Sequence, residues 1–150
     1  MENLNVIYED NHIVVVVKPQ NIPSQADQSG DIDMLSLVKA YIKEKYNKPG
    51  EAYIGLVHRL DRPTGGIMVF ARTSKSANRL SEQIKKGEFV KTYYCVTDGV
   101  PKELDGHVVS YLKKVDNIVK IVPMSETGAK RAVYRHHAAS TYQKDTDLQQ

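Results

Sequence analysis

The alternation of hydrophobic and polar positions along this chain predicts mostly short strands. The run Ile13–Val17 is β-branched at each position and too short for a helix, so we expect a strand from His12 to Lys18 that Pro19 ends. The polar residues 9–11 would turn it back on an earlier strand. The other strand-like runs are Asn5–Tyr8, Tyr53–Val57, Gly66–Ala71, Phe89–Thr97, Val108–Leu112, Ile118–Val122 and Ala129–Ala139.

Two segments repeat apolar residues at helical spacing instead. The first lies between Met34 and Ile42, and the second surrounds Leu80. The candidate N-caps are Asp31 or Asp33 for the first helix and Thr73 or Ser74 for the second. We expect the first helix to end at the turn of residues 47–50 and the second to end at Gly87.

Adjacent strands with only two clear helices indicate an α+β fold, in which helices flank a mixed, largely antiparallel β-sheet. The runs at 108–112 and 118–122 are separated by turn residues and predict a hairpin. At 150 residues the chain is long enough to bury a core, and no repeat or long linker divides it. We therefore expect a single domain over residues 1–150, although the last ten residues contain too little apolar surface to complete a fold.

Composition narrows the class of protein. With 41% hydrophobic and 26% charged residues, the chain resembles ordinary globular proteins. No basic leader precedes an apolar run, and the longest aliphatic stretch is too short to span a bilayer, so we expect a cytoplasmic protein without membrane contact. Cys95 is the single cysteine, which excludes an intramolecular disulfide, and the five histidines lack zinc-ligand spacing. We expect no metal and no cofactor.

Positive charge is concentrated in one part of the chain. Residues 58–91 contain eight Lys or Arg against three acids, whereas the formal net charge of the whole chain is only +3. A basic segment of this kind suits a polyanionic partner such as RNA. Within it, we expect Arg59, Arg62 and Arg72 to contact phosphates.

The basic segment opens with His58–Gly66, HRLDRPTGG, which places Asp61 between two arginines. Pro63 disfavours helix at the residue before it, and the two glycines permit backbone angles closed to other residues, so we expect a shaped loop. The strand that follows would hold this loop from one side, as folds often do with a reactive side chain. The same cluster could also be a solvated ion pair worth under about 1 kcal/mol. The surrounding pattern has to decide between these two interpretations.

Four segments of the chain form a specific set. They are, in chain order, Lys18–Pro19, then His58–Asp61 followed by Thr64–Gly66 and a hydrophobic strand, then Lys91–Tyr93 ahead of Gly99, and finally Lys130–Tyr134. In this order they resemble the signature motifs of the RluA/RluD-type pseudouridine synthases, and they cover nearly the whole chain. The resemblance implies a pseudouridine synthase-like catalytic domain that isomerises a uridine in RNA and needs neither metal nor cofactor.

The chain departs from the family pattern in two places. Gly65 stands where serine is commonest, a small-for-small change that the loop should tolerate. The family also carries a later motif whose basic residue pairs with the catalytic aspartate, and nothing after Tyr134 resembles it. We therefore expect a synthase that is incomplete at its C-terminus and converts little or no uridine by itself.

The resemblance implies roles for the residues of the candidate site. Asp61 would be the catalytic carboxylate, acting as a nucleophile at the ribose or as a base, and Tyr93 would lie against the target uracil. Arg59 would contact the RNA as the target nucleotide leaves its stack. The remaining candidate substrate-binding residues are His58, Arg62, Thr64 and Lys91. Arg59 and Arg62 are also the local candidates for an ion pair that holds the Asp61 carboxylate.

The expected partner is structured RNA, ribosomal RNA more than transfer RNA, and a monomer is favoured. The main alternative is a non-catalytic RNA-binding module or an inactive fragment, in which Asp61 would be a structural ion-pair partner. A protein kinase is excluded because no Gly-rich loop precedes the HRLD sequence and no DFG follows it. A carboxylate-pair glycosidase fits poorly, since the only other acids in the basic segment lie on or after a helix.

Overall fold

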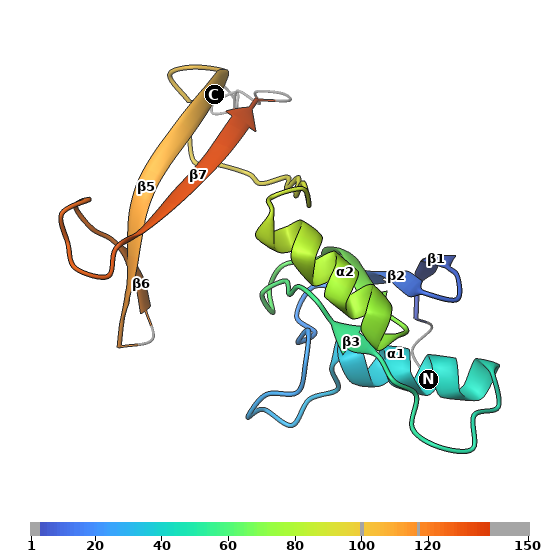
Figure 1. Cartoon of the computed structure of the whole chain (residues 1–150). Helices are drawn as coiled ribbons and strands as arrows, with labels where there is room; N and C mark the ends of the chain where they lie inside the picture. The colour runs from blue at the N-terminus through green and yellow to red at the C-terminus, as the bar shows by residue number, and fades with distance from the viewer. Residues whose placement is uncertain (1–3, 100, 117, 139–150) are drawn as a thin grey trace, which may run out of the picture. The chain divides into compact units, whose positions relative to one another are not determined.

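The computed structural model describes residues 4–99, 101–116 and 118–138. The chain divides into two compact units, an N-terminal unit of Met1–Thr92 and a C-terminal unit of Tyr93–Gln150. Each unit has its own sheet (Figure 1), and the strand pairs among the described residues are all antiparallel. The predicted α+β class and the antiparallel character are confirmed, but the strands form two sheets where we expected one mixed, largely antiparallel sheet. Periodicity in a sequence identifies strands and leaves their partners open.

The sheet of the N-terminal unit is built around the β-branched run. Its strands are β1 (Val6–Glu9), β2 (Ile13–Lys18), β3 (Gly55–Leu56) and β4 (Gly66–Ala71), in the order β1-β2-β4-β3. β2 pairs with β4 along its whole length, from Ile13 opposite Ala71 to Lys18 opposite Gly66. Because side chains alternate along a strand, Val14, Val16 and Lys18 point to the same face, and all three are fully buried.

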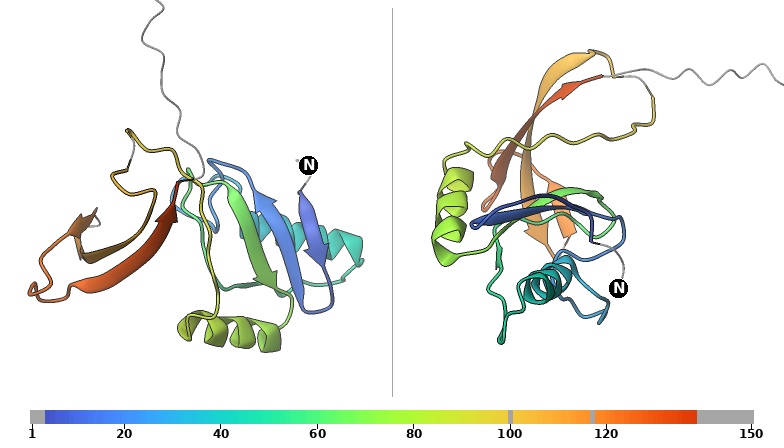
Figure 2. Two further views of the ribbon diagram at one scale, coloured as in Figure 1. Left: turned by 90° about the horizontal axis from the view of Figure 1, so that it is seen from above. Right: turned by 90° about the vertical axis from the view of Figure 1, so that its right-hand side faces the viewer.

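Helix α1 (Met34–Lys45) covers that face of the sheet (Figure 2). Its side chains at 34, 38 and 42 recur at the spacing of one helix face and pack into the core with Phe70 and the β2 valines. Asp33 rather than Asp31 is the N-cap, and its carboxylate accepts from the backbone N–H of Ser36 at 3.1 Å. The predicted helix and one of its two candidate caps are thereby confirmed.

Helix α2 (Ser74–Lys85) packs against β3 and β4 in the N-terminal unit. Thr73 caps it, in a reciprocal arrangement with Ser76 that satisfies both backbone N–H groups. The helix comes so close to β3 that a Cβ added at Gly55 would lie 3.1 Å from the Cβ of Ala77. The absence of a side chain at Gly55 therefore permits this packing.

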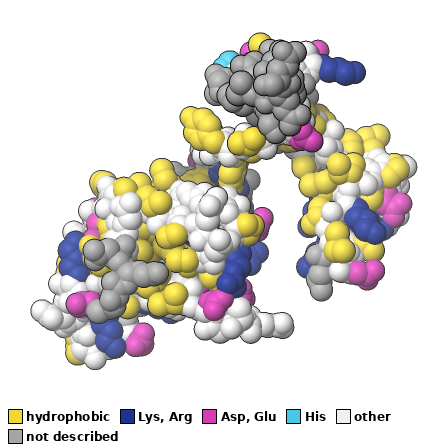
Figure 3. All heavy atoms as spheres, turned by 180° about the vertical axis from the view of Figure 1, so that it is seen from behind, with side chains coloured by type: hydrophobic (Ala, Val, Ile, Leu, Met, Phe, Trp, Pro, Cys, Tyr) yellow, Lys and Arg dark blue, Asp and Glu magenta, His cyan; other side chains and the backbone are white. Residues whose placement is uncertain are grey.

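The C-terminal unit contains β5 (Asp105–Val115), β6 (Ile118–Ile121) and β7 (Lys130–His137), in the order β6-β5-β7. The predicted hairpin is confirmed as the β5–β6 pair. β5 also pairs with β7, with Val109 opposite Val133. Many hydrophobic side chains of this sheet are exposed, and Figure 3 shows hydrophobic side chains spread over the molecular surface.

Two predicted strands differ from the structure. Phe89–Thr97 forms no strand, and Val90, Tyr94 and Val96 are exposed, because no described segment pairs with this stretch. A run of β-forming residues becomes a strand only when a partner satisfies its backbone groups. The strand expected over Tyr53–Val57 shortens to β3. The end of the last predicted strand, at 139, and the final ten residues lie outside the described part of the chain.

Neither of the two helices among the described residues has the length and apolar character needed to cross a membrane.

Candidate active site

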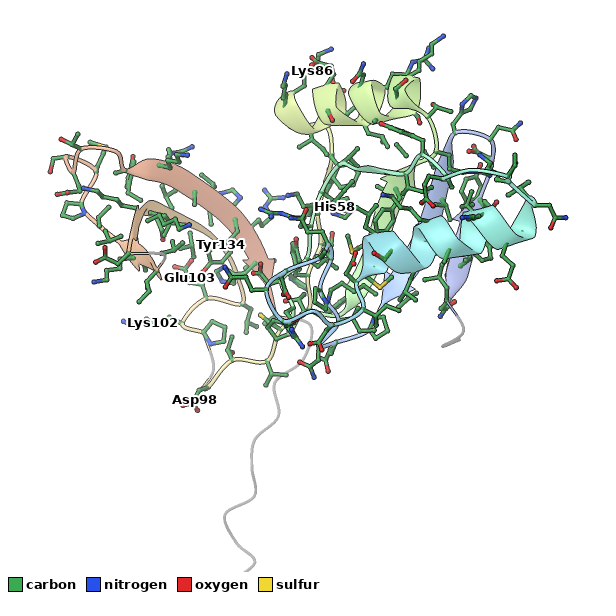
Figure 4. All side chains as sticks on the ribbon, turned by 90° about the horizontal axis from the view of Figure 1, so that it is seen from below. His58, Lys86, Asp98, Lys102, Glu103 and Tyr134 are labelled. Carbon is green, nitrogen blue, oxygen red and sulfur yellow. The ribbon has the colours of Figure 1, made fainter. Side chains whose placement is uncertain are left out.

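The loop His58–Gly66 leaves the sheet at His58, which is labelled in Figure 4. β3 stops pairing with β4 at Leu56, and the backbone N–H of Val69 on β4 instead donates to His58 Nε2 at 3.0 Å. That nitrogen must be unprotonated to accept. Burial, and secondarily the positive charge of Lys91, lower the pKa of His58 and favour the neutral ring. His58 therefore anchors the start of the loop to β4, because its Nε2 accepts the hydrogen bond from Val69.

The opposite end of the loop is held by Lys18, which is fully buried. Its Nζ donates to the backbone oxygens of Pro19 and Arg62 at 3.1 Å each and to that of Thr64 at 2.6 Å. Burial lowers the pKa of Lys18, while the negative charge of Asp61 acts in the opposite direction. One buried ammonium group thus fixes the backbone that follows Asp61 and directs positive charge towards its carboxylate.

Lys18 is a site residue that sequence reasoning missed. The signal is present in the strand pattern, because Lys18 has the same inward phase as Val14 and Val16. A lysine buried at such a position needs polar partners in the interior. Because Lys18 lies on the buried face of the strand, its side chain can be predicted to bond to the backbone of another segment.

Asp61 is exposed and lies where the loop turns. Its backbone oxygen accepts from the N–H of Thr64 at 2.9 Å, which closes a turn over Arg62 and Pro63. Within the described part of the chain, no cation forms an ion pair with its carboxylate, so neither of the two local candidates, Arg59 and Arg62, holds it. Neighbouring side chains on a loop point in different directions, and Arg62 pairs with acids of another loop instead.

Arg62 points away to the acidic loop between β2 and α1. It forms an ion pair with Asp31, approaches Asp27 at 3.8 Å, and donates to Ser29 Oγ at 3.1 Å. The hydrogen bond from Arg62 is the main cause that lowers the pKa of Asp31. The charge of Arg62 is therefore largely matched within the protein, which leaves less of it for a phosphate.

The expected phosphate contact by Arg72 is wrong. Its side chain is only 9% exposed and donates to Glu9 at 2.9 Å and to the backbone oxygen of Asp10. Its guanidinium also lies 4.5 Å from the centre of the Tyr46 ring. A sequence cannot reveal that a strand 63 residues earlier supplies the counter-charge.

The other predicted site residues are placed as follows. Arg59 and Lys91 are exposed, and among the described residues neither has a hydrogen-bond or ion-pair partner. Thr64 is half-buried and accepts from Lys18 through its backbone. Tyr93 is 57% exposed and is the first residue of the C-terminal unit, in a stretch without regular structure. The N-terminal unit therefore brings together Asp61, Arg59 and Thr64 on one loop, with Lys18 beneath it.

A family model described as RNA pseudouridylate synthase matches residues 12–149, and the chain belongs to this family. The match includes the loop His58–Gly66, which carries Asp61, and strands of both units. The family resemblance seen in the motifs is confirmed.

Individual proteins that are similar to this chain are also named pseudouridine synthases. The chain is 32% identical over 111 residues to the ribosomal large subunit pseudouridine synthase D of Buchnera aphidicola subsp. Schizaphis graminum, covering 72% of this chain and 33% of the relative. It is 31% identical over 140 residues to the tRNA pseudouridine synthase C of Yersinia pestis, covering 90% of this chain and 51% of the relative. The chain thus spans between a third and a half of the length of these relatives.

A solved structure shows the same fold. It is titled Human RNA Pseudouridylate Synthase Domain Containing 4 and superimposes with a TM-score of 0.70 at 24% identity, over 86% of this chain and 51% of that one.

Proposed function

We propose that this chain takes part in the isomerisation of a specific uridine in structured RNA to pseudouridine, with Asp61 as the catalytic carboxylate. Membership of the pseudouridylate synthase family supports the reaction. The single observation that supports the residue is its placement, since Asp61 is exposed on a loop whose backbone is bonded to the buried Lys18.

The reaction breaks the bond between ribose C1′ and the uracil nitrogen, turns the base while it stays bound, and joins C1′ to carbon 5. The hydrogen on carbon 5 leaves as a proton and a proton is gained at nitrogen, so no electrons are exchanged with a cofactor. An ionised carboxylate can act as nucleophile at C1′ or as the base that removes a proton. In either role Asp61 must be held in place, and the backbone that follows it is hydrogen-bonded to Lys18.

The same proposal assigns contacts to the other residues. Arg59 and Lys91 are exposed cations that suit phosphate oxygens, and Thr64 offers a hydroxyl on the loop. Arg62 would have to exchange its acidic neighbours for RNA, and His58 acts through the loop it supports. Tyr93 would stack on the target uracil, returning about 1–3 kcal/mol of the cost of extruding the base.

We further propose that both units belong to one catalytic domain, because a single family model spans them. Ribosomal RNA is the favoured substrate, since several relatives are named ribosomal large subunit synthases and fewer are named for tRNA. We also propose that the protein is a monomer and works in the cytoplasm.

Asp61→Asn tests the proposal against a non-catalytic RNA-binding module. Because the chain spans only part of its relatives' length, the conversion is measured with protein in excess over an rRNA transcript, so that a slow reaction is detected. We expect Asp61→Asn to lower conversion by at least about 100-fold with unchanged RNA affinity, as expected for loss of a nucleophile or base. Asp98→Asn, at an exposed carboxylate labelled in Figure 4, is the matched control and should convert normally. RNA binding without conversion by the wild-type chain would favour the binding module, whereas equal conversion by the two variants would exclude Asp61 as the catalytic carboxylate.

A further inference from the structure

Ser24, in the loop between β2 and α1, is buried against the loop that carries Asp61. Only 6% of the residue is exposed. Its hydroxyl donates to the backbone oxygen of Leu60 at 2.6 Å and accepts from the backbone N–H of Leu60 at 3.1 Å. One side chain thus satisfies both polar backbone groups of the residue directly before Asp61, across 36 positions of sequence.

The backbone that follows Asp61 is held by different groups. The oxygen of Arg62 accepts from Lys18 Nζ and also from the N–H of Asn21, at 3.1 Å and 2.8 Å. Residues on both sides of Asp61 are therefore bonded to β2 and to the segment just after it, while the Asp61 side chain is exposed. Ser24 holds the residue before Asp61, and Lys18 and Asn21 hold the residue after it.

We propose that Ser24 is a positioning residue for Asp61. By fixing the Leu60 peptide, its hydroxyl sets the direction in which the Asp61 carboxylate leaves the backbone. This inference rests on the proposed function for its catalytic consequence, but the bracing itself is a property of the loop. A displacement of about 1 Å at a reacting group can cost about 100-fold in rate, so a lost brace should reduce the rate more than RNA affinity.

Ser24→Ala removes the brace, and Ser76→Ala is a matched control. Ser76 is 7% exposed in the same unit, and its hydroxyl also bonds to backbone, donating to the oxygen of His12 at 2.7 Å and accepting from the N–H of Thr73 at 3.2 Å. Both variants lose a buried hydroxyl with backbone partners, so they should lose similar thermal stability. Of the two serines, Ser24 is the one whose hydroxyl bonds to the loop that carries Asp61.

The first measurement is amide hydrogen exchange at Thr64, followed by NMR. The Thr64 N–H bonds to the Asp61 backbone oxygen and not to Ser24, whose hydroxyl bonds to Leu60, so it reports on the turn rather than on the deleted bond. We expect exchange there to rise at least about tenfold in Ser24→Ala and to stay within about twofold in Ser76→Ala, with Ser24→Thr restoring protection by keeping the hydroxyl. Equal change in both alanine variants, or no change in Ser24→Ala, would overturn the proposal. Should Ser24→Ala not fold, Ser24→Cys gives the same comparison with a weaker hydrogen-bonding group.

The second measurement is the single-turnover rate of uridine conversion with protein in excess. We expect Ser24→Ala to lower this rate by about 10- to 100-fold with RNA affinity unchanged, and Ser76→Ala to leave it unchanged. A rate unaffected by Ser24→Ala contradicts the catalytic part. If neither the wild-type chain nor Asp61→Asn converts uridine, the proposed function fails, while exchange at Thr64 still decides whether Ser24 holds the loop.

Discussion

At the scale of single residues, the unit that carries Asp61 depends on charged side chains placed at buried positions. Lys18 lies on the inward phase of β2 and donates to loop oxygens, while Glu9 ends β1 and accepts from several donors. Buried charges are tolerated only when hydrogen bonds replace their lost hydration. Both residues therefore connect segments that are distant in sequence, and the role of each can be tested by substitution.

Replacing Lys18 by methionine should destabilise the loop as well as the unit. The stem remains, and the Arg62 oxygen keeps the N–H of Asn21, but the Thr64 oxygen loses its donor, and an unpaired buried group costs about 1–3 kcal/mol. Urea unfolding should therefore show a loss of this size for Lys18→Met. Lys48→Met, at an exposed position in the turn after α1, should leave the free energy of unfolding unchanged. Equal stability of the two variants would contradict the role of Lys18.

Glu9 predicts a specific dependence of stability on pH. Burial alone would raise its pKa, but hydrogen bonds from Lys45, Tyr46 and Tyr41 together lower it from 4.5 to about 2. Because the folded pKa lies below the unfolded one, the contribution is complete above about pH 4.5 and is lost as the pH falls towards 2. The shift corresponds to roughly 3 kcal/mol for a side chain that is 8% exposed.

The measurement is the difference in unfolding free energy between the wild-type chain and Glu9→Gln. This difference should be constant near neutral pH and should shrink on acidification through that window. A difference that does not change with pH would show that Glu9 is not held in its charged form. The comparison with Gln removes the contribution of the other carboxyl groups, which titrate in both proteins.

At the scale of elements, the sequence predicts what is local and misses what depends on a partner. The β-branched run became β2, and the helices begin at caps that side-chain chemistry predicts. Phe89–Thr97 has strand composition but no described partner, and β3 is cut short where His58 takes its place beside β4. In the site, the loop was predictable from its own sequence, whereas Lys18 and Ser24 reach it from another segment.

The α2 cap gives a prediction at this scale. Thr73→Ala removes the hydroxyl that accepts from the N–H of Ser76 at 3.1 Å, and loss of a Thr cap costs about 1 kcal/mol. Thermal or urea unfolding should show that loss. Ser74→Ala, one position later at an exposed site with no hydrogen bond from its hydroxyl among the described residues, is the control and should have little effect. A control as damaging as Thr73→Ala would argue against capping.

At the scale of the whole molecule, the number of basic residues in the sequence overstates the positive charge that is available to a polyanion such as RNA. Arg62 and Arg72 are paired with acids, so the exposed cations of the basic segment are mainly Arg59, Lys91 and those of α2. The motifs identified the family, because they depend on order along the chain, but pairing between distant residues decides which charges are available. Surface charge from a count is therefore only an upper limit.

The most direct test of the central claim follows the hydrogen on carbon 5 of the target uridine. Pseudouridine has the same mass as uridine, but its formation replaces that hydrogen, so a label at carbon 5 is released to water only if the new bond forms. With protein in excess over labelled rRNA transcript, so that the low conversion expected of an incomplete chain is still detected, we predict slow release by the wild-type chain and at least about 100-fold slower release by Asp61→Asn at equal RNA binding. Release at the same rate by both proteins, or RNA binding without release by the wild-type chain, would contradict the account.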